Sequence, residues 1–319
     1  MKILVTGATG FIGTRLSETL TNSGHEVRNT ARSLASNSST NGELITCDLE
    51  SADNLDHLTT GCDAIVHLAG RAHVMSDNPA TSESLYLSAN VDVTRRLAQS
   101  AARTGVKRMI LMSSVKVNGE STTIDAPFTS QDTPNPQDPY GRSKAQAEQA
   151  LWDVASTSAL EGVVIRPPLV YGPGVRANFA SLIGIVDRGF PLPLGSIRNN
   201  RSFVSVDNLI DCIATALQSS NVAGQTFLVS DGNDLSTPEL IRSIASALHK
   251  SPTLFPFPPV LLKLAATSAG KRSAYDRLCG SLTVDIALTK QKLSWTPPFT
   301  IQDSMQRTVD AFIQSRDSR

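Results

Sequence analysis

Lys2-Ile3-Leu4-Val5-Thr6-Gly7-Ala8-Thr9-Gly10-Phe11-Ile12-Gly13 is the stretch that opens the chain after Met1 and decides its fold. Its apolar first half predicts a strand buried on both faces of a parallel sheet. Its second half places Gly7, Gly10 and Gly13 ahead of a helical segment at 14–22. In the order strand, glycine-rich turn, helix, the backbone can approach a pyrophosphate, and the helix N-terminus offers free N–H groups. We therefore predict a dinucleotide-binding turn rather than a tight turn without a ligand.

The composition is that of an ordinary globular protein, with 40 % hydrophobic and 18 % charged residues in a chain of 319. Lys plus Arg and Asp plus Glu number 29 each, so no overall charge attracts nucleic acid or an anionic membrane. The four cysteines show neither metal-like nor disulfide-like spacing, which predicts reduced thiols and no metal site. We find no secretory signal and no apolar run near the roughly 20 residues of a membrane span. The sequence predicts a cytoplasmic protein with no nucleic-acid or membrane partner.

Predicted strands and helices alternate from the first strand to Arg166. Further strands are expected at 25–30, 44–48, 64–70 and 107–112, with helical segments between them. This alternation predicts an α/β fold with a doubly wound parallel sheet of the Rossmann kind. We expect residues 1–166 to form a dinucleotide-binding domain and 167–319 a smaller α+β substrate-binding domain, with 203–230 rejoining the first. Helices in the second half are expected at 207–219, 238–250, 260–268 and 301–315.

The residues after the second strand bear on the choice of cofactor. An NAD site usually has an acid there that binds the adenosine 2′-hydroxyl, whereas this chain has Ala31-Arg32-Ser33. An arginine can pair with a 2′-phosphate, and no carboxylate is present to repel that phosphate. We therefore favour NADP(H) over NAD(H), and a plain surface arginine is the alternative interpretation of Arg32.

Polar residues near the ends of later strands are further candidates. Asp48 ends a short strand and suits a hydrogen bond to the adenine edge. We interpret His67, inside a buried strand, as a core histidine, whereas His73 in the following polar loop is a candidate for substrate contact. Asn90 precedes a helix expected at 91–104, and it either caps that helix or orders the active-site backbone.

Tyr140-Gly-Arg-Ser-Lys144 places a phenol and an ammonium on one face of a helix that starts at Pro139. A tyrosine pKa of about 10 is too high for efficient proton transfer at neutral pH, and we expect the lysine to lower it. Ser114 follows the strand at 107–112, and ligands collect beyond the carboxyl ends of parallel strands. We predict that Ser114 and Tyr140 bind the same substrate oxygen, although a solvated helix end would also explain the Tyr-x-x-x-Lys pattern alone.

These elements in this order resemble the extended short-chain dehydrogenase/reductase family and, within it, the nucleotide-sugar epimerase/reductase branch. The resemblance covers essentially the whole chain. The matching motifs are Gly7-x-x-Gly10-x-x-Gly13, Asp48-Leu49, His67-Leu-Ala-Gly70, Ser113-Ser114, Tyr140-x-x-x-Lys144, Arg166-Pro-Pro-Leu-Val-Tyr-Gly-Pro173, Asn178-Phe179, Arg201-Ser-Phe-Val-Ser-Val-Asp207, and Asp285 ahead of Leu293-Ser-Trp-Thr-Pro297.

The resemblance implies a role for each matching position. Ser114 would hold the sugar 4-oxygen, Tyr140 would exchange its proton, and Lys144 would bind the nicotinamide ribose. The other cofactor-binding positions would be Gly7, Gly10, Phe11, Ile12, Gly13, Arg32, Asp48, Leu49, Leu68, Ala69, Gly70, Asn90 and Pro167. The other substrate-binding positions would be His73, Lys116, Asn178, Leu194, Arg201 and Arg277, with Arg272 open as the alternative to Arg277 for the pyrophosphate.

The residues after Ser114 narrow the reaction that the resemblance implies. A 4,6-dehydratase carries an Asp-Glu pair there, and an epimerase acting at C3 or C5 needs an extra acid–base group, whereas this chain has Val115-Lys116. Hydride exchange at C4 of a UDP-sugar remains, by a 4-ketoreductase using NADPH or a 4-epimerase with tightly bound NAD. Arg32 and Ser114-Val-Lys-Val-Asn-Gly119 favour a reductase of UDP-4-keto-6-deoxy-N-acetylhexosamine in bacterial polysaccharide synthesis.

The sequence also bears on the oligomeric state and on an alternative functional class. The family resemblance implies a homodimer formed through helices in segments 84–104 and 144–158. A non-catalytic NADP-binding regulator on the same fold is the alternative from another functional class, since fold alone does not determine function. That alternative predicts loss of Ser114, Tyr140 or Lys144, and all three are present.

Overall fold

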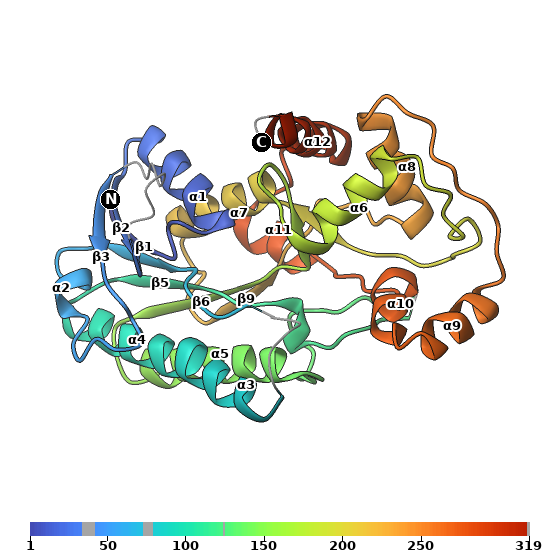
Figure 1. Cartoon of the computed structure of the whole chain (residues 1–319). Coiled ribbons are helices and arrows are strands. Elements are labelled where there is room, and N and C mark those ends of the chain that lie inside the picture. The colour runs from blue at the N-terminus through green and yellow to red at the C-terminus, as the bar shows by residue number, and fades with distance from the viewer. Residues whose placement is uncertain (34–41, 73–78, 124, 318–319) are drawn as a thin grey trace.

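One parallel sheet runs across the middle of the molecule (Figure 1). The computed structural model describes residues 1–33, 42–72, 79–123 and 125–317. Seven strands lie in the order β3-β2-β1-β4-β5-β6-β9, and every neighbouring pair is parallel. Their bounds are β1 (Lys2–Thr6), β2 (Glu26–Ala31), β3 (Glu43–Thr46), β4 (Ala64–His67), β5 (Arg108–Met112), β6 (Glu161–Arg166) and β9 (Gln225–Leu228).

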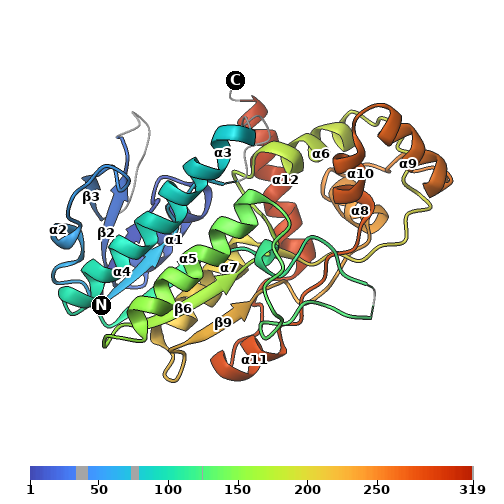
Figure 2. The same cartoon turned by 90° about the horizontal axis from the view of Figure 1, so that it is seen from below.

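Helices cover both faces of this sheet because alternate side chains of each strand point to opposite sides. On β1, Ile3 and Val5 belong to one apolar core and Leu4 to the other. The first core is completed by α1 and α7, and the second by α4 and α5, which cross the opposite face in Figure 2. The bounds of the helices in this part are α1 (Phe11–Asn22), α2 (Asp56–Thr59), α3 (Pro79–Tyr86), α4 (Val93–Arg103), α5 (Pro139–Ala155) and α7 (Val206–Gln218).

The second part of the chain has its own apolar core and a separate two-stranded parallel sheet. The strands of that sheet are β7 (Leu169–Tyr171) and β8 (Phe203–Ser205). The chain then passes through α7 and returns to the main sheet, where β9 pairs with β6. The remaining helices are α6 (Ala177–Asp187), α8 (Thr237–Ala247), α9 (Pro259–Ser268), α10 (Arg272–Cys279), α11 (Ala287–Leu293) and α12 (Ile301–Asp317).

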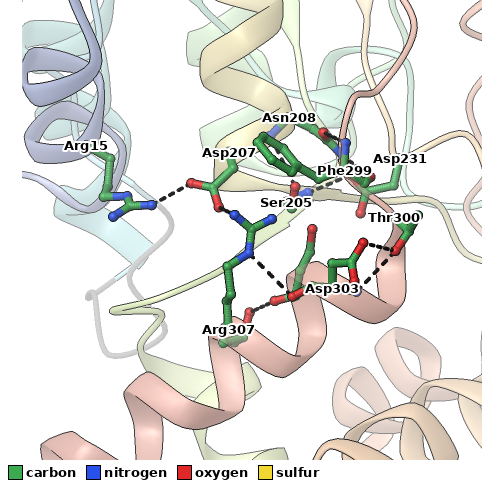
Figure 3. A network of polar contacts seen from close by, with 11 residues as sticks. Arg15, Ser205, Asp207, Asn208, Asp231, Phe299, Thr300, Asp303 and Arg307 are labelled. Atoms are coloured by element: carbon green, nitrogen blue, oxygen red, sulfur yellow. Dashed lines mark hydrogen bonds and ion pairs between the residues drawn. The ribbon is translucent and has the colours of Figure 1, made fainter. Parts of the chain in front are cut away.

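Polar contacts tie α1 to the C-terminal helix (Figure 3). The Asp207 carboxylate accepts from Arg15 on α1 at 2.7 Å and from Arg307 on α12 at 3.1 Å. Asn208 forms two hydrogen bonds of 2.9 Å with the backbone of Phe299, and the Arg307 guanidinium stacks on the Phe299 ring. Residues at the start of α7 therefore link the helix after the glycine turn to the last helix of the chain.

The predicted doubly wound parallel sheet is confirmed, and the strands expected at 25–30 and 107–112 are β2 and β5. The helix expected at 91–104 is preceded by a π-helical stretch, η1 (Leu87–Asp92), which leads into α4. In the second half of the chain, α6, α10 and α11 were not predicted. Within the described residues, none of the helices has both the length and the apolar character needed to cross a bilayer.

Candidate active site

The glycine turn brings α1 unusually close to the strands beneath it. Gly7 has a φ of +69°, and a Cβ there would lie 2.8 Å from the amide nitrogen of Ala69. A Cβ on Gly13 would lie 2.2 Å from the carbonyl oxygen of Gly7. Gly10 is the N-cap of α1 and has no side chain to occupy the first N–H groups of that helix. The turn therefore leaves an uncovered helix N-terminus, which suits a pyrophosphate.

A cavity of about 390 Å³ lies at the carboxyl ends of β1 to β4, which is within the usual range of ligand pockets of about 300–1,000 Å³. It extends from the residues after β2 and β3 to those after β4. Eight of the predicted cofactor-binding residues line it: Gly7, Gly10, Arg32, Asp48, Leu49, Leu68, Ala69 and Gly70. Its length, glycine wall and open helix N-terminus fit a dinucleotide.

Some predicted cofactor residues lie around this cavity without lining it. Gly13 is in the tight contact between α1 and Gly7, and the side chains of Phe11 and Ile12 pack on the apolar core. The carbonyl of Pro167 accepts a hydrogen bond from the Val115 amide at 3.0 Å. Val115 belongs to the catalytic loop, the segment 113–118 that follows β5 and contains Ser114. These residues shape the backbone of the site.

Asn90 is almost completely buried and does not cap a helix, because it lies inside η1. Its Oδ1 accepts from the Arg71 amide at 2.8 Å, and its Nδ2 donates to the Arg71 carbonyl at 3.2 Å and to Ser143 Oγ at 2.9 Å. It thus joins the loop after β4 to the first turn of α5. Of the two roles considered for Asn90, these contacts favour ordering of the backbone, and π-helical turns are frequent at functional sites.

Ser114, Tyr140 and Lys144 form a group next to the Gly70 wall of the cavity. Asp138 caps α5 by accepting from the Gly141 amide at 2.6 Å, which sets the start of the helix one residue before Tyr140. The Ser114 side chain acts on the Tyr140 hydroxyl as a hydrogen-bonding group that lowers its pKa. Lys144 Nζ donates to the Met112 carbonyl at 2.9 Å and lies 3.4 Å from where a Cβ on Gly70 would be. The predicted catalytic residues are therefore adjacent, and Lys144 reaches the wall of the cofactor cavity.

Burial dominates the electrostatics of these groups. It raises the pKa of Tyr140 to about 12, against the opposing effect of the Ser114 hydrogen bond. Burial also lowers the pKa of Lys144 to about 8, with Glu148 opposing. The expectation that Lys144 lowers the tyrosine pKa is wrong for this structure. Desolvation destabilises the phenolate form of Tyr140 more than the Ser114 side chain stabilises it. The Lys144 ammonium donates its hydrogen bond to the Met112 carbonyl instead.

The two histidines lie in different situations. His67 is buried between Thr6 Oγ1 at 2.7 Å and Thr94 Oγ1 at 3.2 Å, as expected of a core histidine. Its pKa is lowered to about 3 by burial and by the charge of Lys144, so it is neutral at physiological pH. His73, the candidate for substrate contact, lies outside the described residues.

A second cavity of about 250 Å³ lies in the C-terminal part, between α6, α8 and α10. Three of the predicted substrate residues line it together, namely Asn178, Arg201 and Arg277. Most of its wall is apolar, and this was not anticipated. The apolar lining residues are Leu169, Phe179, Leu182, Ile185, Phe203, Leu240, Ala274 and Leu278.

The other predicted substrate residues are placed differently. Leu194 is buried in the third apolar core. Arg272 pairs with Asp276 at 2.9 Å on the exposed side of α10, whereas Arg277 faces the cavity. Lys116 forms ion pairs with Glu120 and with Asp138, the residue that caps α5. The geometry therefore favours Arg277 over Arg272 as a ligand for phosphate.

A parallel sheet with a glycine turn, and a Ser-Tyr-Lys group at its carboxyl edge, define an NAD(P)-dependent enzyme of the extended short-chain dehydrogenase/reductase class. Residues 3–230 match the model of the NAD dependent epimerase/dehydratase family, and the chain belongs to that family. The resemblance expected from the sequence motifs is thus confirmed.

The relatives extend this similarity over the whole chain. The chain is 44 % identical over 316 residues to a UDP-glucose 4-epimerase of Vibrio cholerae, covering 99 % of this chain and 96 % of the relative. It is 30 % identical over 338 residues to a UDP-glucose 4-epimerase of Mycolicibacterium smegmatis, covering 98 % of each. Among solved structures, MoeE5 in complex with UDP-glucose and NAD has a TM-score of 0.79 at 26 % identity, covering 99 % of this chain and 100 % of that one.

Proposed function

We propose that this protein is an NAD-dependent UDP-hexose 4-epimerase. The observation that carries the proposal is the 44 % identity, over 99 % of the chain, to a UDP-glucose 4-epimerase, in a chain that keeps Ser114, Tyr140 and Lys144, with Lys144 beside Gly70 of the cofactor cavity. The bound cofactor would supply reversible hydride exchange at C4 of the sugar. The residues of the chain would supply proton transfer and orientation.

Each catalytic group then has a distinct task. Ser114 and Tyr140 would hold the 4-oxygen of the sugar between their hydroxyls, and Tyr140 would take up and return the proton of that oxygen. Lys144 lies beside Gly70 at the wall of the cofactor cavity, where it would orient the nicotinamide ribose. Ser114 and Tyr140 are half-buried and Lys144 is buried, which would limit the access of water to the reacting oxygen.

The second cavity would receive the nucleoside diphosphate. Arg201 and Arg277 can pair with phosphate oxygens, and Asn178 can bind from the end of α6. The apolar wall would contact the base and ribose. We extend the same proposal to the division of labour between residues 1–166 and 167–319, and to a homodimer formed through α4 and α5, for which the molar mass in solution is the test.

A 4-ketoreductase using NADPH is the second candidate, and Arg32 supports it. This arginine follows Ala31 at the edge of the cofactor cavity, where an NAD enzyme usually carries an acid. The Tyr140 pKa of about 12 also keeps the phenol protonated, as a general acid for reduction requires.

One experiment separates the candidates. Purified protein is incubated without added cofactor with UDP-glucose or UDP-galactose and with their N-acetyl forms, and products are resolved by chromatography. In parallel, absorbance at 340 nm is followed with NADPH or NADH and UDP-4-keto-6-deoxy-N-acetylglucosamine. Interconversion without added cofactor supports the epimerase, whereas loss of the NADPH signal alone replaces it with the reductase. Binding of NADPH without turnover in either assay would favour the non-catalytic regulator.

A further inference from the structure

A buried ion pair lies directly behind the catalytic residues and has no part in the proposed chemistry. Glu148 on α5 is 3 % exposed, and Arg166 at the end of β6 is 4 % exposed. Arg166 Nη2 lies 2.6 Å from Glu148 Oε2, and Arg166 Nε lies 2.9 Å from Glu148 Oε1. This two-point pairing fixes the orientation of both side chains.

The Glu148 carboxylate reaches the catalytic loop through Ser113. The Ser113 hydroxyl donates to Glu148 Oε1, and Ser114 is the next residue along the chain. One helical turn before Glu148, Lys144 donates to the carbonyl of Met112, the residue before Ser113. Lys144 and Glu148 of α5 therefore hold the consecutive residues Met112 and Ser113 at the end of β5. Ser114, whose hydroxyl lies next to Tyr140, follows directly.

Asn118 completes the cluster on its far side. Arg166 Nη1 donates to Asn118 Oδ1 at 2.9 Å, and Asn118 Nδ2 donates to the carbonyl of Thr129 at 2.7 Å. The cluster thus connects β6, α5 and the segments on both sides of Ser114. A buried polar network with this degree of hydrogen bonding is rigid, and it specifies one arrangement of the groups it holds.

Glu148 is also the counter-charge of Lys144. In the described part of the chain, Glu148 on α5 acts on the pKa of Lys144, and Lys144 acts on the pKa of His67 on β4. His67 is neutral and Tyr140 is protonated at neutral pH, so neither offsets the buried ammonium. The Glu148 carboxylate raises the pKa of Lys144 against the effect of burial.

We propose that Glu148 is a positioning residue of the active site, which fixes Ser114 through Ser113 and places a carboxylate one helical turn from Lys144. The inference rests on the proposed roles of Ser114, Tyr140 and Lys144. Its direct readout, the titration of Lys144, does not depend on which sugar is the substrate.

The test compares Glu148→Gln with Glu161→Gln. Glu161 pairs with Arg108 at 2.6 Å and joins the amino ends of the same two strands, β5 and β6, far from the site. Each variant removes one carboxylate charge and keeps the side-chain shape. Lysine labelled with ¹³C at Cε is incorporated into the full chain, and the Lys144 resonance is assigned by its absence in Lys144→Met.

We expect the Lys144 titration to move to lower pH in Glu148→Gln and to stay at the wild-type value in Glu161→Gln. With the substrate that the wild type converts, we expect kcat to fall about tenfold to a hundredfold in Glu148→Gln, since small displacements of catalytic groups have effects of that size. An unchanged Lys144 titration in Glu148→Gln, or the same shift in both variants, would overturn the proposal. Wild-type protein without turnover of any tested sugar would instead count against the proposed function.

Ser113→Ala covers the case in which Glu148→Gln does not fold. It removes one hydroxyl and leaves the Glu148–Arg166 pair intact. We expect a lower kcat at unchanged KM and an unchanged Lys144 titration, because the carboxylate remains. An unchanged kcat would show that Ser113 does not transmit the position of Glu148, and the proposal would be wrong.

Discussion

The substitution Gly7→Ala tests whether the glycine turn is required by steric contact as well as by backbone conformation. Gly7 has a φ of +69°, where an alanine costs about 1–2 kcal/mol. In addition, its Cβ would lie 2.8, 3.0 and 3.1 Å from three backbone atoms of Leu68 and Ala69, which cannot rotate away. Forcing an atom into such a contact adds about 1–3 kcal/mol. We expect the free energy of unfolding to fall by about 2–5 kcal/mol, the sum of these two costs.

Gly24→Ala is the matched control. Gly24 has a φ of +81°, and a Cβ there meets nothing within 4 Å. It therefore carries the backbone cost alone. Urea unfolding gives the free energy for each variant, and NADH fluorescence gives cofactor binding. We expect only Gly7→Ala to lose cofactor binding, because it pushes β1 away from the loop after β4. Equal free-energy losses in the two variants, with NADH binding retained in both, would refute the argument.

Three further predictions follow from the site. Tyr140→Phe should lower kcat at least about a hundredfold while NADH binding stays near the wild-type value, because only the proton-transferring hydroxyl is removed. Retained turnover would exclude the phenol as the acid–base group. Arg277→Ala should raise the KM for the UDP-sugar about tenfold or more, as loss of a charged hydrogen bond does. Arg272→Ala should leave this KM unchanged. The reverse ranking would contradict the placement of Arg277 at the second cavity. Burial lowers the Lys144 pKa from 10.5 to about 8. Between these values the unfolded chain binds more protons than the folded chain, so the free energy of unfolding should rise with pH. Urea unfolding at pH 8 and pH 10 should show a smaller rise in Lys144→Met than in the wild type. An identical pH dependence in the two proteins would show that Lys144 is not buried as described.

The sheet and the cofactor turn were predictable because they depend on local patterns. A buried strand followed by Gly7, Gly10 and Gly13 admits few structures, and the same holds for the short apolar strands that follow. The contact of Ser114 with Tyr140 was predictable for a related reason, since both residues lie at the carboxyl edge of a parallel sheet.

What the sequence did not reveal depends on burial and on contacts between distant segments. The raised Tyr140 pKa reflects desolvation first, and then the charges of Asp138 and of Tyr86, whose ring centroid lies 6.0 Å away. The Glu148–Arg166 pair joins residues 18 apart that belong to different elements. A repeat of the helical spacing in Tyr140-x-x-x-Lys144-x-x-x-Glu148 was the available signal, because it places all three side chains on one face of α5.

The return of the chain to the main sheet through β9 has a consequence for any attempt to divide this protein. A fragment that stopped at Arg166 would lack the strand that pairs with β6, and it would expose unpaired N–H and C=O groups of a strand that is buried at every residue after Glu161. It would also lose α7, which supplies Ile210, Ile213 and Leu217 to the apolar core under α1. Open apolar edges of this kind pair with one another and aggregate. The cofactor-binding half is therefore not a module that can be excised or grafted by cutting the chain once.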